Sequence, residues 1–202
     1  MNNKLTHTET GVTRNVQVTT KPEGFQSSLG PTNLLDYIVP FKNITTENLQ
    51  IYYQNIQGLR WKSSEVPNFL YPNLPHILCS TEHHLNQHEI EIIQTENYTL
   101  VASFCRNYSK MDGVCIFVNK DLNFINAVLR KFSLEQDIAV CAVKLSDTSY
   151  NICVLSIYTA LSVNFVKFLK KLKTILNLLY NSKTQFIICA DININYLVKN
   201  KK

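Results

Sequence analysis

Short apolar runs, rich in β-branched and aromatic residues, recur from residue 49 onward and are separated by polar links. Runs of about four to eight such residues without glycine or proline are typical of buried strands. One such run, 185–190, ends directly before Asp191 and is predicted to be parallel to its neighbour and covered on both faces. The strands predicted in this way are 49–55, 76–81, 98–105, 114–119, 137–145, 151–158 and 185–190.

Three other segments have helical spacing, namely 59–71, 87–94 and 163–180. The third is the clearest, because its apolar residues recur three and four positions apart while its lysines occupy the other face. These lysines are Lys167, Lys170, Lys171 and Lys173. We interpret them as a solvated helix face in preference to a nucleic-acid-binding patch.

The order of these elements predicts the fold class. A β-α-β-α opening is followed by closely spaced strands, and short links of this kind favour antiparallel pairing. Asp112 and Gly113 form a plausible turn between two of these strands. Two strand systems mixed with helices predict an α/β fold, a sandwich of two sheets with helices outside.

Residues 1–48 lack this periodicity. They are rich in Thr, Asn and Gln, with prolines and glycines scattered among them. Such a segment buries little apolar surface, so it is interpreted as a disordered or loosely docked tail. The predicted division is therefore a polar tail over 1–48 and a single folded domain over 49–202.

Composition narrows the class of protein without identifying it. The chain has 202 residues, of which 45% are hydrophobic and 17% charged, and a net charge of +5. This mild basic bias is compatible with a polyanionic partner but does not by itself predict one. No apolar core follows the first residues as in a signal peptide, and no apolar run is long enough to span a bilayer. No membrane partner is expected.

The six cysteines lie inside apolar, strand-like runs, and no two have the close spacing of a zinc knuckle or a redox pair. They are Cys79, Cys105, Cys115, Cys141, Cys153 and Cys189. We interpret them as reduced core residues, which predicts an intracellular protein, nuclear or cytoplasmic and not secreted.

Polar residues suited to phosphate or metal chemistry follow four of the predicted strands. They are Asn55, Glu82, Tyr158, Asp191 and Asn193. Singly, each has an ordinary structural explanation: an asparagine after a strand is usually a turn former, and a glutamate before a helix is usually an N-terminal charge partner. Alternation along the last strand could point Asp191 and Asn193 the same way.

Together, in this order and spacing, these residues and their neighbours resemble a known family. The runs are 54–59, 80–85, 113–117, 155–158 and 190–193. They are similar to the endonuclease/exonuclease/phosphatase superfamily, and more narrowly to the apurinic-type endonuclease domain of non-LTR retrotransposons, where a reverse transcriptase follows. The Thr-Glu-x-x-Leu and Asp-x-Asn blocks make the resemblance fairly specific, and it covers about residues 49–195.

The resemblance implies a DNase I-like sandwich and a hydrolase that cleaves phosphodiester bonds in DNA with Mg²⁺, or with Mn²⁺ as second choice. It implies that Glu82 binds the metal ion and that Asn55 helps to hold both metal and phosphate. Tyr158 would support the phosphate oxyanion, and Asp191 would align or deprotonate the attacking water. Asn193 would contact the phosphate.

The chain also departs from the family pattern. Thr159 follows the tyrosine where the family usually has arginine, Ala190 replaces a glycine, and Ile192 replaces an aromatic residue. The closing Ser-Asp-His block, which supplies the family's essential histidine, is absent. The resemblance therefore implies a domain without its last strands and an enzyme that is inactive or weak. A longer polyprotein or a partner chain would complete the sheet, and marginal folding is expected without one.

Three alternatives stay open. The first is a zinc site made by residues of one short stretch, Cys79, His83, His84 and His88, which we consider the weakest. The second is a non-catalytic remnant of a retroelement or a nucleic-acid-binding fragment. The third is another phosphodiesterase or phosphatase of the same superfamily.

Overall fold

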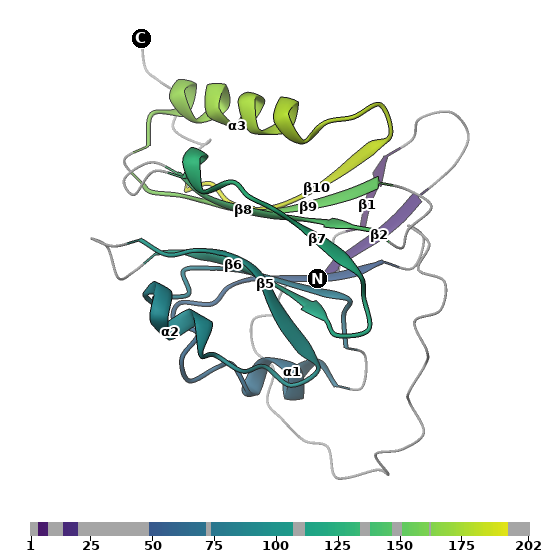
Figure 1. The fold of residues 1–202 in the computed structure, drawn as a ribbon, viewed down its shortest axis with the longest axis vertical. Helices are drawn as coiled ribbons and strands as arrows, with labels where there is room; N and C mark the ends of the chain where they lie inside the picture. Colours follow the sequence, from purple (N-terminus) through teal and green to yellow (C-terminus); the bar gives the residue numbers. More distant parts are fainter. Residues whose placement is uncertain are drawn as a thin grey trace.

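A computed structural model describes residues 4–7, 14–19, 49–71, 74–106, 112–133, 138–146, 151–161 and 163–193. In it, two β-sheets pack face to face, and each is covered by helix on its outer side (Figure 1). Helix α3 lies over one sheet, and helices α1 and α2 lie under the other. No helix in these ranges is long and apolar enough to cross a bilayer.

The first sheet has the strand order β1-β2-β3-β4-β6-β5. Its strands are β1 (Lys4–His7), β2 (Arg14–Thr19), β3 (Gln50–Asn55), β4 (Ile77–Thr81), β5 (Tyr98–Phe104) and β6 (Val114–Asn119). Strands β2, β3 and β4 are mutually parallel, whereas β6 runs antiparallel to both β4 and β5. The parallel pairing of β3 with β4 brings the carboxyl ends of these two strands together.

The second sheet has the order β10-β9-β8-β7. Its strands are β7 (Phe124–Ala127), β8 (Ile138–Leu145), β9 (Asn151–Thr159) and β10 (Thr184–Asp191). Strand β10 is parallel to β9, and the other pairs are antiparallel. A 3-10 turn, Arg130–Phe132, connects β7 to β8.

Three α-helices flank the sheets: α1 (Glu65–Leu70), α2 (Gln87–Glu91) and α3 (Phe165–Leu179). Helix α2 begins at a capping box, in which the Asn86 side chain accepts from the Glu89 N–H and the Glu89 carboxylate accepts from the Asn86 N–H. Helix α3 begins at Asn164, whose side chain accepts from the Lys167 N–H. It buries Phe168, Ile175 and Leu179 against the second sheet.

Alternation along the strands divides the interior into three apolar layers. Ile51 of β3, Cys79 of β4, Val154 of β9 and Cys189 of β10 belong to the layer between the two sheets. Intervening residues face outward to the helices: Leu78, for example, packs in the layer that also contains residues of α1 and α2. This alternation decides which strand-end side chains face the space between the sheets.

The predicted two-sheet sandwich with outer helices is confirmed. Every strand predicted from the sequence is present, with its bounds shifted by no more than one residue at either end. The predicted antiparallel pairs and the parallel pairing of β10 are also confirmed. All six cysteines are buried, as predicted, and none of them forms a disulfide bond.

Four details differ from the prediction. Strand β7 was not predicted, because its four residues contain a polar residue, Asn126, and form no apolar run. Ile125 and Asn126 are both exposed. Helix α1 is shorter than 59–71, since residues 60–64 form turns. Strand β10 is parallel but is the edge strand of its sheet, and it is not fully covered on both faces, since Ile188 is 43% exposed.

The fourth difference concerns the N-terminal segment. Strands β1 and β2 lie within residues 1–48, so ordered structure begins before Leu49, and Val18 of β2 is opposite Ile51 of β3. The segment Arg14–Thr19 holds only two apolar residues, Val16 and Val18, too few to predict a strand. The remainder of 1–48 lies outside the described residues, as do 107–111 and 194–202, and the interpretation of 1–48 as a tail stays a prediction.

Candidate active site

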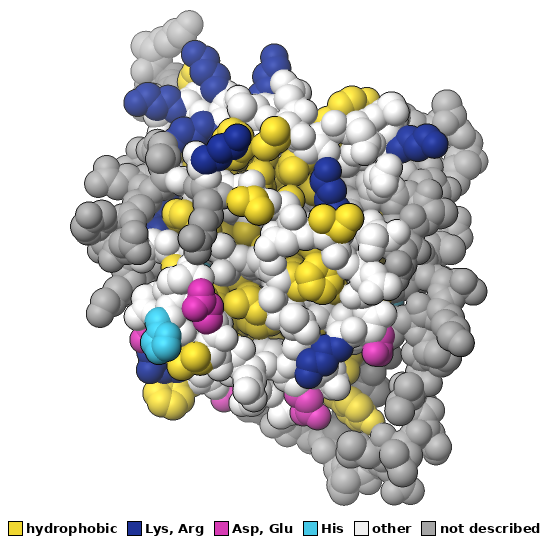
Figure 2. Space-filling model, viewed as in Figure 1, with side chains coloured by type: hydrophobic (Ala, Val, Ile, Leu, Met, Phe, Trp, Pro, Cys, Tyr) yellow, Lys and Arg dark blue, Asp and Glu magenta, His cyan; other side chains and the backbone are white. Residues whose placement is uncertain are grey.

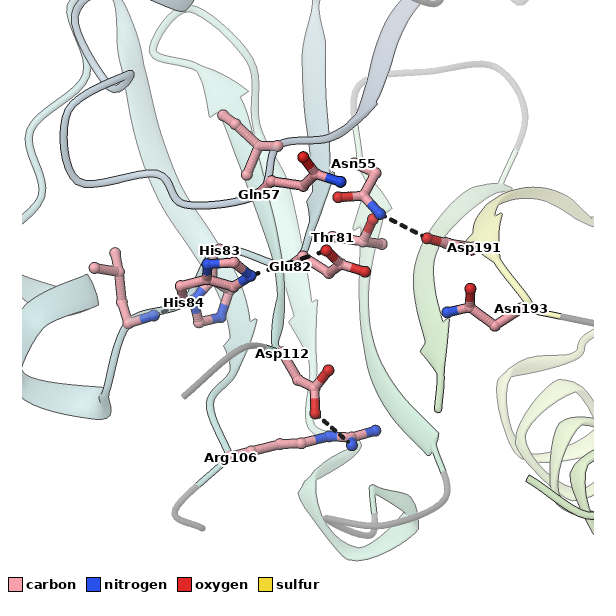
Figure 3. Close-up of polar contacts among 12 residues, drawn as sticks. Asn55, Gln57, Thr81, Glu82, His83, His84, Arg106, Asp112, Asp191 and Asn193 are labelled. Carbon is pink, nitrogen blue, oxygen red and sulfur yellow. Dashed lines mark hydrogen bonds and ion pairs between the residues drawn. The ribbon is translucent and has the colours of Figure 1, made fainter. Parts of the chain in front are cut away.

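Polar side chains from both sheets meet where four strands end (Figure 3). In the first sheet Asn55, the last residue of β3, is opposite Thr81, the last residue of β4. In the second sheet Tyr158 of β9 is opposite Asp191 of β10. Both pairs of strands are parallel, so each pair presents its carboxyl ends together, the place where open α/β sheets bind ligands.

A hydrogen bond joins the two sheets at this point. The Asn55 side-chain amide donates to Oδ2 of Asp191 over 2.7 Å, across 136 positions of sequence. The other polar atom of Asn55, Oδ1, is buried and has no hydrogen-bond partner among the described residues. An unsatisfied buried acceptor costs about 1–3 kcal/mol, so this oxygen is a candidate ligand for a cation or for a donor group of a substrate.

Glu82 follows β4 in a left-handed backbone conformation, with φ of +55°. Two backbone hydrogen bonds hold it there: its N–H donates to the Gly113 carbonyl, and its carbonyl accepts from the Gly58 N–H, both over 2.8 Å. Gln57, His84 and Asn193 also have positive φ. Such conformations cost about 1–3 kcal/mol each and gather at ligand sites, where the surrounding structure holds them.

Tyr158 lies beside a buried ion pair. Arg106 Nη1 donates to Asp112 Oδ2 over 2.8 Å, and the side chains of the two residues are only 2% and 10% exposed. The Arg106 guanidinium also stacks over the Tyr158 ring, 5.4 Å from its centre. Burial, then a hydrogen bond with Asp112 and the carboxylates of Asp112 and Glu82, raise the pKa of the Tyr158 phenol further above neutral pH, so it is protonated and is a hydrogen-bond donor.

Asn193 does not share the orientation of Asp191. Its backbone is left-handed, with φ of +47°, which breaks the alternation of the strand. Its side-chain amide donates to the Thr159 carbonyl over 2.8 Å, and this bond ties the end of β10 to the end of β9. Asn193 lies next to the site in Figure 3, but its side-chain amide bonds to the backbone carbonyl of Thr159.

His83 is fully buried next to Glu82 and has a structural role. Its Nδ1 accepts from the Leu85 N–H over 3.1 Å, and its Nε2 lies 3.2 Å from the Phe104 carbonyl. The neutral ring with its proton on Nε2 satisfies both partners. Burial lowers the pKa of His83 from 6.5 to about 4.

This burial predicts that acid destabilises the fold. Between pH 6.5 and pH 4 the unfolded chain binds a proton at His83 that the folded protein does not, so stability falls as the pH falls through this window, by about 3 kcal/mol at most. Urea unfolding at several pH values should show this slope. In a His83→Asn variant, which keeps an acceptor for Leu85 but does not titrate, the slope should be smaller, and an equal slope would contradict the assignment.

The donor set at the strand ends fits a hard divalent cation. Glu82 supplies a carboxylate and Asn55 an unpaired amide oxygen, and Mg²⁺ is usually held by one or two carboxylates together with waters and substrate phosphates. In the described ranges no three residues of the types His, Cys, Asp and Glu are grouped closely enough to form an all-protein metal cage. Mg²⁺ does not need one.

The zinc alternative loses its support. Cys79 faces the apolar layer between the sheets, and both ring nitrogens of His83 are directed at protein partners. His88 lies exposed on α2. The cysteine and the three histidines of residues 79–88 therefore do not converge on one metal position.

The sequence did not predict that Arg106 and Asp112 lie beside the site. Asp112 was predicted only as a turn former, and Arg106 was not singled out. They could have been predicted from their positions, because an arginine and an aspartate at the two ends of one connection between strands can form an ion pair. Thr81, whose hydroxyl lies 3.3 Å from the Tyr53 hydroxyl, was likewise treated only as a strand residue.

No protein-family model and no curated protein matches the sequence. Solved structures with a similar fold include the endonuclease domain of TRAS1, a telomere-specific non-LTR retrotransposon, with a TM-score of 0.52, 14% identity, and coverage of 72% of this chain and 59% of that one. An AP endonuclease from Archaeoglobus fulgidus has a TM-score of 0.47 and 20% identity, covering 70% and 56%. The human Nocturnin catalytic domain has a TM-score of 0.44 and 15% identity, covering 70% and 60%.

The likeness to the TRAS1 endonuclease domain shows a shared fold, so the predicted fold class is confirmed. The chain spans about 59% of the length of that endonuclease domain. At this level of identity the likeness extends to the fold alone.

Proposed function

We propose that the strand-end site is a divalent-metal-dependent, phosphodiester-cleaving site of the DNA endonuclease type, and that cleavage by this chain is weak or absent. The observation that carries the proposal is the hydrogen bond between Asn55 and Asp191, which joins the carboxyl ends of β3 and β10 beside the strained Glu82. Nuclease-type chemistry needs oxygen ligands for a cation, a base for water and a donor to a phosphate oxygen at one place.

Each of these residues has a role that its surroundings support. Glu82 and Asn55 Oδ1 would hold the cation, which would neutralise charge on the scissile phosphate and polarise it. Asp191, oriented by the Asn55 amide, would align the attacking water and accept its proton. Tyr158, protonated at neutral pH, would donate its hydroxyl hydrogen to a phosphate oxygen in place of Asp112. The Asn193 side-chain amide, which has a second N–H besides the one bonded to Thr159, would contact the phosphate.

DNA is the substrate class that we propose. The fold is shared with the TRAS1 endonuclease, and the net charge of +5 suits a polyanion. Lys167, Lys170 and Lys173 are exposed on α3, and lysine and arginine side chains gather over this helix in Figure 2. They remain assigned to the solvated face, because the site residues come from the strand ends and not from α3.

Weak cleavage follows from the missing histidine. No Ser-Asp-His sequence occurs in the 202 residues. A positioned acid–base or electrostatic group of this kind contributes roughly 10²–10⁴-fold to rate. The residues that remain can bind metal and phosphate without completing the stabilisation of the transition state.

Supercoiled plasmid incubated with the protein and Mg²⁺ should therefore show little or no nicking. Anisotropy of a labelled DNA duplex should nevertheless show Mg²⁺-dependent binding that a Glu82→Ala variant loses. Rapid nicking that Glu82→Ala abolishes would contradict the proposal that cleavage is weak, but it would support the assignment of the site. Binding that is the same with and without Mg²⁺, in both proteins, would overturn the assignment itself.

A further inference from the structure

His84 lies in the site and has an unsatisfied nitrogen. Its Nε2 atom is buried, has no hydrogen-bond partner among the described residues, and lies 3.9 Å from Oε2 of Glu82 (Figure 3). The side chains of the two residues are 21% and 18% exposed, so both are largely shielded from solvent without being fully buried. A buried nitrogen without a partner costs about 1–3 kcal/mol unless a ligand meets it.

The backbone holds His84 in this place at some cost. Its φ is +57°, and its N–H donates to the Asp112 carbonyl over 3.2 Å. The ring lies over Gly58, since a Cβ added there would be 3.6 Å from Nδ1 of His84. A side chain larger than hydrogen at Gly58 would border the imidazole directly. The loop thus presents the imidazole next to Glu82 by several independent contacts.

We propose that His84 Nε2 and the Glu82 carboxylate ligate the same divalent ion, so that this site prefers a later first-row transition ion such as Co²⁺ over Mg²⁺. The inference rests on the proposed function, because it concerns the cation of that site. Imidazole suits transition ions, whereas Mg²⁺ selects oxygen ligands. Ligand atoms about 2.1 Å from one ion lie at most about 4.2 Å apart, and the 3.9 Å separation is within this limit.

The two neighbouring histidines differ from His84 in this respect. Both ring nitrogens of His83 face protein partners, the Leu85 N–H and the Phe104 carbonyl. His88 is exposed on α2. His84 is thus the histidine of this stretch whose ring nitrogen is directed at Glu82, and His88 provides a matched control.

Calorimetric titration with Co²⁺ and with Mg²⁺ tests the proposal on the full chain. The wild-type protein should bind Co²⁺ more tightly than Mg²⁺. His84→Ala should weaken Co²⁺ binding by about tenfold or more, equivalent to about 1.4 kcal/mol, and leave Mg²⁺ binding unchanged. His88→Ala should change neither. The visible absorption of bound Co²⁺ should change in His84→Ala and not in His88→Ala, which reports ligation independently of activity.

Glu82→Ala separates failure of this inference from failure of the proposed function. If Glu82→Ala loses both ions and His84→Ala keeps its Co²⁺ affinity, His84 is not a ligand and the proposed function stands. If Glu82→Ala binds both ions as the wild type does, the proposed cation site itself is wrong. Because alanine is strained at positive φ, His84→Asn is the second variant; asparagine tolerates this backbone, and the same loss of Co²⁺ affinity is expected.

Discussion

Replacing Asp112 by alanine is expected to lower the free energy of unfolding by roughly 3–5 kcal/mol, because it leaves a buried guanidinium without its counter-charge. The Arg106 side chain is 2% exposed, and its ion pair with Asp112 is 2.8 Å long. Its Nε and Nη2 atoms already lack hydrogen-bond partners among the described residues, so no other described hydrogen-bond acceptor would compensate. Urea unfolding monitored by circular dichroism would measure the loss.

The control is to remove both charges together. An Arg106→Met/Asp112→Leu double variant leaves no unpaired buried charge, and replacing a buried ion pair by apolar residues of similar volume is often neutral. We expect this protein to be more stable than Asp112→Ala alone. A loss below about 1 kcal/mol in Asp112→Ala would place the pair in the range of solvent-exposed ion pairs and contradict its burial.

Gly113→Ala is expected to cost roughly 2–5 kcal/mol, the sum of a backbone strain and a steric overlap. Gly113 has φ of +114°, and a Cβ placed there would lie 2.3 Å from Nε2 of His83. The imidazole cannot move away easily, since it is fully buried and accepts a hydrogen bond from Leu85. The Gly113 carbonyl also accepts a hydrogen bond from the Glu82 N–H, so the change should disturb the cation site.

Gly58→Ala is the matched control for this effect. Gly58 also has a positive φ, +100°, but an added Cβ would meet only His84 Nδ1, at an ordinary 3.6 Å. The control should therefore show the strain without the overlap, about 1–2 kcal/mol. Thermal unfolding of the two variants separates the cost of backbone strain from the cost of the steric overlap with His83. Equal losses would show that His83 yields to the added methyl group.

The strands could be predicted from the sequence because each apolar run has a sharp polar boundary. The same boundaries identified Asn55, Glu82, Tyr158 and Asp191 as strand-end residues, and the structure places all four at carboxyl ends of parallel neighbours or directly after one. These are local patterns, and a single sequence is enough to show them.

What could not be predicted depends on contacts between distant segments. The bond from Asn55 to Asp191 spans 136 positions, and no local pattern reports it. Arg106 is buried by tertiary packing, although an isolated arginine before a polar link is typical of a surface. Asn193 was expected to point with Asp191, and its positive φ, which residue type alone does not predict, turned its amide to Thr159.

The central claim is that Glu82 and Asn55 bind one divalent cation next to Asp191, where the strand ends of the two sheets meet. Two-dimensional ¹H–¹⁵N spectra during a Mg²⁺ titration test it most directly, through the side-chain amide of Asn55, which bonds to Asp191. This signal should shift saturably in the wild-type protein and stay still in Glu82→Gln, while that of Asn126, exposed on β7, should not shift in either. An Asn55 signal that ignores saturating Mg²⁺, or shifts equally in Glu82→Gln, would contradict the claim.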